Sequence, residues 1–423
     1  MKKIILISGA LLILLAAFSQ SKIDSLMQLI QNAPEEKKID LYLELSFNSR
    51  DDSAKSNHFN RLAYGLATRN KHVPQLAKSM YYFGETNFYA RDFAGAIPHY
   101  EDAILLFEQL KDTFQMTNCY NSIGICYQEM DQGEKAIEQF VNGLKLCDHN
   151  QEYAAELLSN IAMEHQKMQN YRDAIRYYRK AMQINIAIKD TGSRAVNYNG
   201  IGNVYTNMSK SDSAILNYNV ALYLFRKVKR SDRQAIALTN LATEYTNFND
   251  SLNKALEYFG KGWNEFQKVG WQFYEPEIKQ GFAGVYRKQG DFKKAIAFYN
   301  ESLVLSDHYK RGFELQKSNY AGLYKTYESM GDYKSALKYF ILSSQYNDSL
   351  VQKEKYEQVV SLEKRYETEK KENEITQLEA KQQITEVQLR KNKQLKLLGF
   401  VTVALLLASI IIVLRKYFDK LST

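Results

Sequence analysis

The sequence predicts an all-α solenoid, a stack of about seven or eight helical hairpins followed by one long charged helix and one transmembrane helix. The first observation is an alanine that recurs about every 40 residues, with an aromatic residue four positions later. The second is the scarcity of helix breakers, since the 423 residues include only four prolines. The third is an uncharged run of 18 residues near the C-terminus. Because one hairpin cannot bury its apolar face alone, we expect the copies to stack.

Residues 1–19 have the three regions of a secretory signal peptide. Two lysines follow Met1, an uncharged apolar run extends from Ile4 to Phe18, and small residues lie at its end. We predict cleavage after Ser19. The alternative is an uncleaved N-terminal anchor, and in both cases the rest of the chain is exported.

Residues 20–79 have a helical but irregular pattern. We interpret this segment as a degenerate helical hairpin that caps the N-terminal end of the array. Terminal repeats are usually atypical, because their outer face meets water instead of a neighbour. Two apolar clusters at helical spacing support this interpretation, one formed by Leu41, Tyr42, Leu43 and Leu45, the other by Phe59, Leu62, Ala63 and Leu66.

The regular array is predicted over residues 80–349. The recurring alanines are Ala96, Ala136, Ala174, Ala214, Ala255, Ala295 and Ala336. The aromatic residues four positions later are Tyr100, Phe140, Tyr178, Tyr218, Phe259, Tyr299 and Phe340. A small residue follows three positions after each aromatic, and another recurs upstream at Gly84, Gly124, Ala162, Gly202, Ala242 and Ala283. Small residues permit close helix crossings, and the aromatic residues fill the space beside them.

The stretch from Ala283 to Leu305 shows how one hairpin is expected to be built. Gly290 can end the first helix in a left-handed conformation, because glycine lacks a Cβ. Asp291 can accept the free N–H groups at the start of the second helix. Ala283 and Ala295 are the small residues at the expected crossing.

This order of small and aromatic residues resembles the tetratricopeptide repeat. The period near 40 residues exceeds the usual ~34 and is similar to the extended-helix subclass of kinesin light chains, so we expect longer helices. Three positions depart from the pattern: Asn87 and His165 replace tyrosine, and Tyr324 replaces a small residue. The resemblance implies a right-handed superhelix with a concave groove that binds a protein or peptide.

Residues 350–396 are rich in Glu, Lys, Gln and Arg and contain neither Gly nor Pro, which predicts one long helix. Val359, Leu362 and Tyr366 have the spacing of a coiled-coil seam, but the seam then decays. A weak stalk that forms a homodimer and a single solvated helix both fit this pattern.

Residues 397–414 carry no charge and would extend roughly 27 Å as a helix, which predicts a transmembrane span. Basic residues lie on both sides of it, so charge alone does not orient it. The signal peptide predicts that the repeats lie outside the cytoplasmic membrane. Residues 415–423 then form a short cytoplasmic tail.

Composition and motifs favour a protein without a catalytic site. The net charge of +8 is spread along the chain, which argues against nucleic acid as a partner. Cys119, Cys126 and Cys147 exclude a full disulfide framework, and we expect them to be small buried side chains. The six histidines show no metal-ligand spacing, and we interpret His165 as a packing residue. No phosphate-binding loop or nucleophile motif occurs, so no metal or cofactor is predicted.

One polar feature stands out. Asparagines recur in the first helices of successive hairpins, at Asn121, Asn160, Asn199, Asn203 and Asn240. The resemblance places them on the concave groove, where each amide could donate to and accept from the backbone of an extended peptide. The alternative is that they bond only within or between neighbouring helices.

The order of signal peptide, repeat array, charged helix and single span resembles the sensory part of membrane regulators of Bacteroidetes-type bacteria. The resemblance implies a scaffold or sensor in the inner membrane, with its array in the periplasm. It would bind a protein or peptide and relay the event to a separate signalling partner. The alternative is a truncated or split sensor histidine kinase or transcriptional regulator, because residues 415–423 are too short for an output domain.

Overall fold

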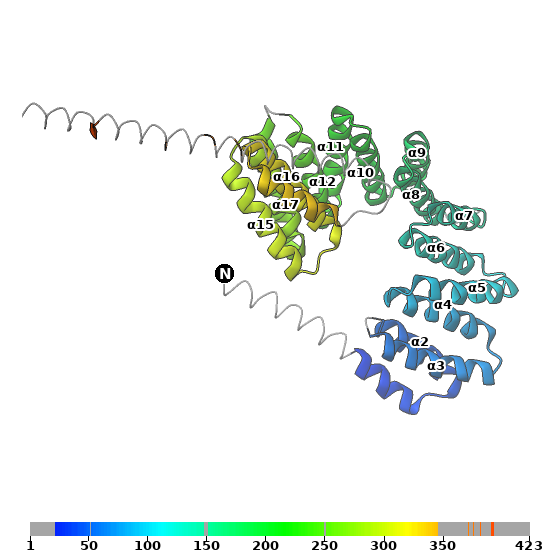
Figure 1. Ribbon diagram of the computed structural model, residues 1–423. Coiled ribbons are helices and arrows are strands. Elements are labelled where there is room, and N and C mark those ends of the chain that lie inside the picture. The colour runs from blue at the N-terminus through cyan, green and yellow to red at the C-terminus, as the bar shows by residue number, and fades with distance from the viewer. Residues whose placement is uncertain are drawn as a thin grey trace, which may run out of the picture. The chain divides into compact units, whose positions relative to one another are not determined.

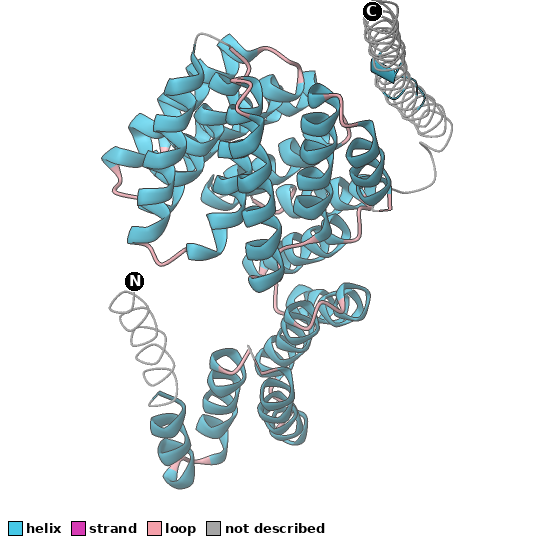
Figure 2. Ribbon diagram, turned by 60° about the vertical axis from the view of Figure 1, so that its left-hand side comes forward, coloured by secondary structure: helices cyan, strands magenta, loops and turns pink. Residues whose placement is uncertain are grey.

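The computed structural model describes residues 22–50, 52–147, 151–248 and 251–345, together with residues 371, 375, 381, 391 and 392. The described residues form helices joined by short turns, with no strand among them (Figure 2). None of the helices in these ranges is both long and apolar enough to span a membrane. The predicted segments 1–19, 397–414 and 415–423, and most of 350–396, lie outside the described residues.

The chain divides after Asp291 into two units, each of which is described by itself. The first unit begins with a helix over residues 22–32. It continues with α2 (Glu35–Asn48), α3 (Ser53–Arg69), α4 (Val73–Tyr89), α5 (Phe93–Gln109), α6 (Thr113–Glu129), α7 (Gly133–Leu144), α8 (Gln151–Lys167), α9 (Tyr171–Ala187), α10 (Thr191–Asn207), α11 (Ser211–Lys227), α12 (Ser231–Thr246), α13 (Leu252–Lys268), the short 3-10 helix η2 (Gln272–Tyr274) and α14 (Glu275–Lys288). The second contains α15 (Phe292–His308), α16 (Phe313–Met330) and α17 (Tyr333–Ser344).

Within the first unit, from α2 to α14, helices that follow one another in the chain pack together, and α15, α16 and α17 do the same within the second unit (Figure 1). The first helices of successive pairs also contact one another, α6 with α8, α8 with α10 and α12 with α14. This is the neighbour-by-neighbour packing of a helical-repeat solenoid, as the sequence predicted.

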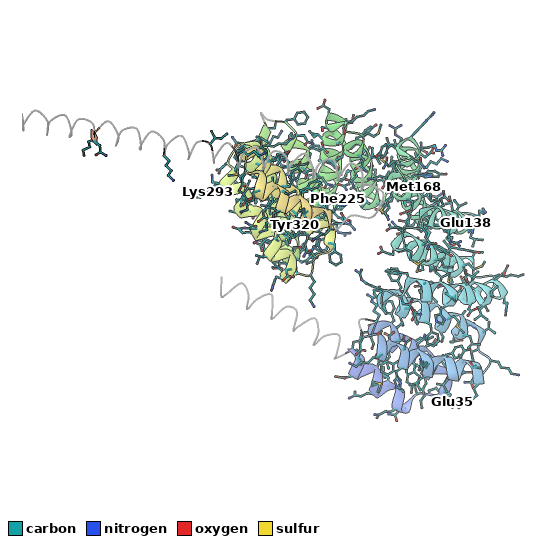
Figure 3. The ribbon with its side chains drawn as sticks, viewed as in Figure 1. Glu35, Glu138, Met168, Phe225, Lys293 and Tyr320 are labelled. Carbon is teal, nitrogen blue, oxygen red and sulfur yellow. The ribbon has the colours of Figure 1, made fainter. Side chains whose placement is uncertain are left out.

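The recurring residues of the sequence pattern form the core of the array. All seven alanines from Ala96 to Ala336 are fully buried, and the seven aromatic residues are at most 6 % exposed. Phe225 lies in the same interior, packed with Leu222 and Leu241, whereas Glu138 of α7 is exposed (Figure 3). Cys119 and Cys126 are free and buried, and burial raises the pKa of the Cys126 thiol to about 12.

Glycines of the first helices lie directly against the repeated aromatic rings. A Cβ added to Gly124 would lie 2.4 Å from Cε1 of Phe140 in the second helix of the same pair. A Cβ on Gly200 would lie 2.6 Å from Cζ of Tyr178, which belongs to the preceding pair. The aromatic rings therefore join helices both within a pair and between pairs. In the second unit Gly322 lies against Tyr299 of the preceding helix, whereas Tyr324 packs its ring edge to face on Phe340, with 5.2 Å between centroids.

The turns repeat about every 20 residues, because most helices have 17 residues and the turns between them are short. Long helices thus account for the long period, as predicted. Gly290 has a φ of 78°, the left-handed conformation expected of it. Most other turns take this conformation without glycine, at Lys71, Arg91, Lys111, Asp131, Gln169, Lys189, Ser209, Lys229 and Lys310. Each turn is closed by a hydrogen bond from the next N–H to the carbonyl five residues earlier, such as Asp190 N to Asn185 O.

The N-terminal part contains the helix over residues 22–32 and the pair α2 and α3, which share a buried cluster. The helix over residues 22–32 contributes Leu26 and Ile30 to a buried cluster with Leu45 of α2 and Phe59 of α3. Helix α4 begins at Val73, so the first regular pair starts before residue 80.

Candidate functional site

The candidate site is the row of asparagines on the first helices of four successive pairs. Asn121 lies on α6, Asn160 on α8, Asn199 and Asn203 on α10, and Asn240 on α12. All five are half-buried. The structure brings them together as two groups, one on α6 and α8 and the other on α10 and α12.

The first group links α6 to α8. Asn160 donates a 3.0 Å hydrogen bond from Nδ2 to Oδ1 of Asn121. Asn121 in turn donates from Nδ2 to Oε1 of Glu156 on α8, at 3.3 Å. Burial between the helices and the neighbouring Glu152 hold the pKa of Glu156 above its usual value, although the hydrogen bond from Asn121 lowers it.

The second group links α10 to α12. Asn240 donates from Nδ2 to Oδ1 of Asn199 at 3.1 Å and lies 3.4 Å from Oδ1 of Asn203. Oδ1 of Asn203 also accepts a 2.8 Å hydrogen bond from the hydroxyl of Tyr218 on α11. Tyr218 is one of the repeated core aromatic residues. Its hydrogen bond to Asn203 therefore connects the asparagines of this group to the core.

A third contact links α8 to α10, the helices between the two groups. The hydroxyl of Ser159 on α8 donates a 2.8 Å hydrogen bond to Oδ1 of Asn197 on α10. Asn197 is 1 % exposed. These contacts link α6 to α8, α8 to α10 and α10 to α12, and we call this set of polar side chains the polar seam. Bonding between neighbouring helices, one of the two alternatives raised by the sequence, therefore occurs.

The seam does not use all of its hydrogen-bonding groups. Among the described residues, Asn160 uses Nδ2 but has no partner for Oδ1, and Asn199 uses Oδ1 but has no partner for Nδ2. The first offers an acceptor and the second a donor, each on a half-buried side chain. This pair of groups matches the C=O and N–H groups of a polypeptide backbone.

Two aromatic residues extend the first group along the same helices. The rings of Phe114 on α6 and Tyr153 on α8 meet edge to face, with 5.1 Å between their centroids. Phe114 is 45 % exposed. Residues 114 and 121, like residues 153 and 160, are separated by seven positions and share one helix face. The sequence reasoning missed Phe114, Tyr153 and Glu156. The seven-residue spacing from the asparagines identifies Phe114 and Tyr153 but not Glu156.

His165 has the packing role that the sequence suggested. Its ring stacks on that of Tyr177, with 5.2 Å between centroids, and burial lowers its pKa. Within the described ranges, no three His, Cys, Asp or Glu side chains are grouped so that they could hold a metal ion.

Two parts of the sequence match family models described as tetratricopeptide repeat, residues 153–227 and residues 277–307. The first match extends from α8 to the end of α11. No curated protein matches the sequence.

Several solved structures share the fold. Aspartyl phosphate phosphatase F from Bacillus subtilis is 16% identical over 78% of this chain and 89% of its own, with a TM-score of 0.58. The apo form of RapI is 16% identical over 83% and 99%, with a TM-score of 0.55. The apo form of the quorum sensor NprR from B. thuringiensis is 15% identical over 77% and 97%, with a TM-score of 0.56. At such identities the likeness concerns the fold.

Proposed function

Because the chain is a tetratricopeptide repeat protein, we propose that it is a membrane-anchored scaffold or sensor that binds a protein or an extended peptide along α6, α8, α10 and α12. Binding takes place outside the cytoplasmic membrane. The long helix predicted for residues 350–396 passes the event toward a separate signalling partner.

The observation that carries the proposal is the polar seam with its free acceptor at Asn160 and free donor at Asn199. An extended peptide offers both kinds of backbone group in every residue, so one segment can satisfy both amides. The hydrogen bonds to Asn121 and Asn240 hold the two side chains in place before the ligand arrives, which reduces the entropy lost on binding. The exposed ring of Phe114 adds an apolar contact for a side chain of the ligand.

Two further observations support the sensing role and the location. One of the structures with this fold is described as a quorum sensor. The predicted signal peptide over residues 1–19 and the uncharged run over residues 397–414 support export and anchoring.

The proposal is tested by photo-cross-linking in cells. A photoreactive phenylalanine analogue replaces Phe114, next to the seam, or Tyr223, which is 66 % exposed on the second helix α11. We expect the Phe114 variant to capture a discrete partner segment that mass spectrometry identifies and that the Tyr223 variant does not capture. Capture of the same proteins from both positions would contradict a binding site on the first helices.

A further inference from the structure

Helix α9 presents a row of basic side chains to solvent. Arg172, Arg176, Arg179 and Lys180 are all exposed. Arg172 and Lys180 are eight positions apart, which corresponds to about 12 Å of helix at ~1.5 Å per residue. Because α9 is the second helix of its pair, this row is separate from the asparagines of the first helices.

Three of these four cations have no acidic partner among the described residues. Asp173 forms an ion pair with Arg176, at 2.9 Å between Oδ1 and Nη2. Arg176 and Lys180 also lie over the ring of Tyr177, at 5.1 and 5.3 Å from its centroid. Among the described residues Arg172, Arg179 and Lys180 have no acidic partner, and Arg172 and Arg179 have no aromatic partner either. The row therefore carries a net positive charge. Tyr177 positions two of its side chains, those of Arg176 and Lys180.

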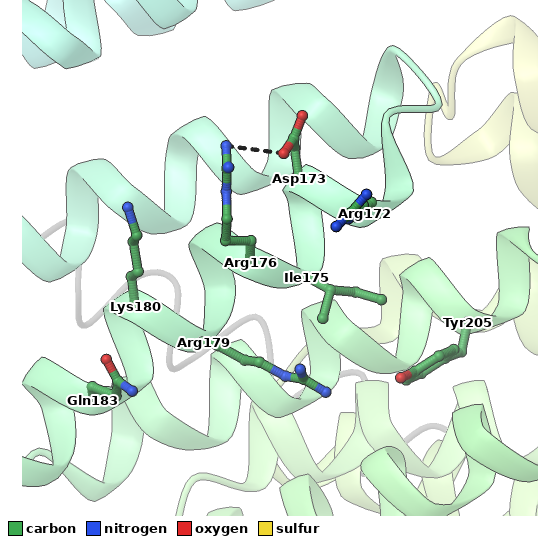
Figure 4. A pocket seen from close by; sticks show the side chains of 8 residues that line it. All are labelled: Arg172, Asp173, Ile175, Arg176, Arg179, Lys180, Gln183 and Tyr205. Carbon is green, nitrogen blue, oxygen red and sulfur yellow. Dashed lines mark ion pairs between the residues drawn. The ribbon is translucent and has the colours of Figure 1, made fainter.

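The row borders a groove of about 820 Å³ that is lined by α9 and by Tyr205 of α10. Figure 4 shows the guanidinium group of Arg179 extending toward the side of the groove on which Tyr205 lies, with Ile175 beside it. The dashed line marks the pair of Arg176 with Asp173. The groove thus combines free cationic groups with one aromatic and one aliphatic wall.

Equivalent positions of the neighbouring second helices lack these charges. The repeat places Glu134 and Glu138 of α7, and Asp212 and Leu216 of α11, where α9 has Arg172 and Arg176. The repeat framework does not require arginine at these positions, since α7 and α11 fold without it. The basic row is therefore a property of α9 rather than of the solenoid.

We infer that the basic face of α9 is a second docking site, which binds an acidic segment of a partner protein. A guanidinium group presents parallel N–H donors that match the two oxygens of a carboxylate. Four cations within about 12 Å fit closely spaced Asp or Glu side chains, and the hollow beside Tyr205 accommodates the backbone that carries them. A membrane surface is less suited, because the lipid would have to enter a groove on one side of a single helix.

The test uses the full chain and a fluorescein-labelled peptide of alternating glutamate and alanine, whose binding is followed by fluorescence anisotropy. The variant Arg172→Gln/Arg179→Gln removes the two cations that have neither an acidic nor an aromatic partner and keeps helix-forming side chains. The matched control, Arg226→Gln/Lys227→Gln, removes the same charge from exposed positions of α11. We expect the α9 variant to bind about tenfold more weakly, as loss of two charge-assisted contacts predicts, and the control to bind within about twofold of the wild type.

Three outcomes would overturn the inference. If both variants bind the peptide equally weakly, the peptide is attracted by the overall positive charge of the protein and not by α9. Equal binding of a peptide with glutamine in place of glutamate would remove the requirement for carboxylates. Sedimentation of the wild type, but not of the α9 variant, with anionic phospholipid vesicles, combined with no peptide binding, would assign the face to a membrane.

Discussion

Asn160 of α8 donates its amide to Asn121 of α6 at 3.0 Å, and this hydrogen bond joins residues 39 positions apart in the chain. Alanine at either position breaks the same bond. The two residues differ in what remains, because Oδ1 of Asn160 has no partner among the described residues, whereas both polar atoms of Asn121 are engaged. The pair therefore allows stability and ligand binding to be separated by experiment.

The contact of Gly124 with Phe140 predicts a test of the packing. Replacement of Gly124 by Ala places a methyl group 2.4 Å from a ring that is fully buried. We expect a loss of about 1–3 kcal/mol in the free energy of unfolding, measured with urea. The control is Gly65→Ala in α3, where an added Cβ has no neighbour within 4 Å. Helix propensity alone predicts that this variant gains about 1 kcal/mol, and a gain at Gly124 as well would contradict the packing account.

The left-handed turns predict a stabilising change. Lys189 has a φ of 61°, which a residue with a Cβ adopts at a cost. We expect Lys189→Gly to raise the free energy of unfolding by about 1 kcal/mol. Gly331→Ala, at a φ of 78°, should lower it by a similar amount. Thermal melts of both variants check the signs, and a destabilised Lys189→Gly protein would show that the lysine side chain has a role beyond the turn.

The start of α10 predicts a pH dependence. Oδ1 of Asp190 accepts a 3.0 Å hydrogen bond from N of Ser193. Partial burial raises the pKa of Asp190, but hydrogen bonds from Ser193 and Gly192 outweigh this effect and leave the pKa below its ordinary value. The carboxylate therefore stabilises the fold above the pKa of the unfolded chain, and this contribution disappears as the pH falls through the lower, folded pKa.

We accordingly expect Asp190→Ala to cost about 1 kcal/mol at neutral pH and progressively less in acid, measured by urea denaturation at several pH values. Asn170 at the start of α9 makes no such side-chain bond, so Asn170→Ala is the control and should change stability little. A cost at Asp190 that does not vary with pH would contradict the assigned role of the carboxylate.

The proposed location predicts the behaviour of the full chain in a Gram-negative host. We expect it to remain in the membrane fraction after alkaline extraction, with the array digested by protease added to spheroplasts. Deletion of residues 397–414 should release the array into the periplasm. An array that protease reaches only after the inner membrane is lysed would place it in the cytoplasm instead.

The repeat pattern was sufficient to predict the fold. The alanines and aromatic residues of each copy can all be buried together only if successive helical hairpins stack. The seven aromatic residues from Tyr100 to Phe340 all lie in the core. The turns were predicted less well. Gly290 signals its conformation, but Lys111 and Lys189 do not, since closure of the turn and packing of the flanking helices override the preference of a lysine.

The candidate site was predicted only in outline. The sequence identified the asparagines but not their partners, because the spacing of a bonded pair varies from 37 residues for Asn203 and Asn240 to 41 for Asn199 and Asn240. Helix register decides which amides meet, and the repeat period does not specify it. For the same reason Glu156 and Tyr218 could not be assigned to the seam from the sequence.

The central claim is tested most directly by measuring Kd for the synthetic form of the segment captured at Phe114. The comparison is between Asn160→Ala/Asn199→Ala and Asn121→Ala/Asn240→Ala, which break the same two bonds between the asparagines. The account predicts a lower Tm for both variants, at least about tenfold weaker binding for the first pair, and a smaller change in Kd for the second, which removes only the bonds that hold the two amides in place. Equal effects of the two pairs on Kd would contradict it and leave the asparagines with a structural role only.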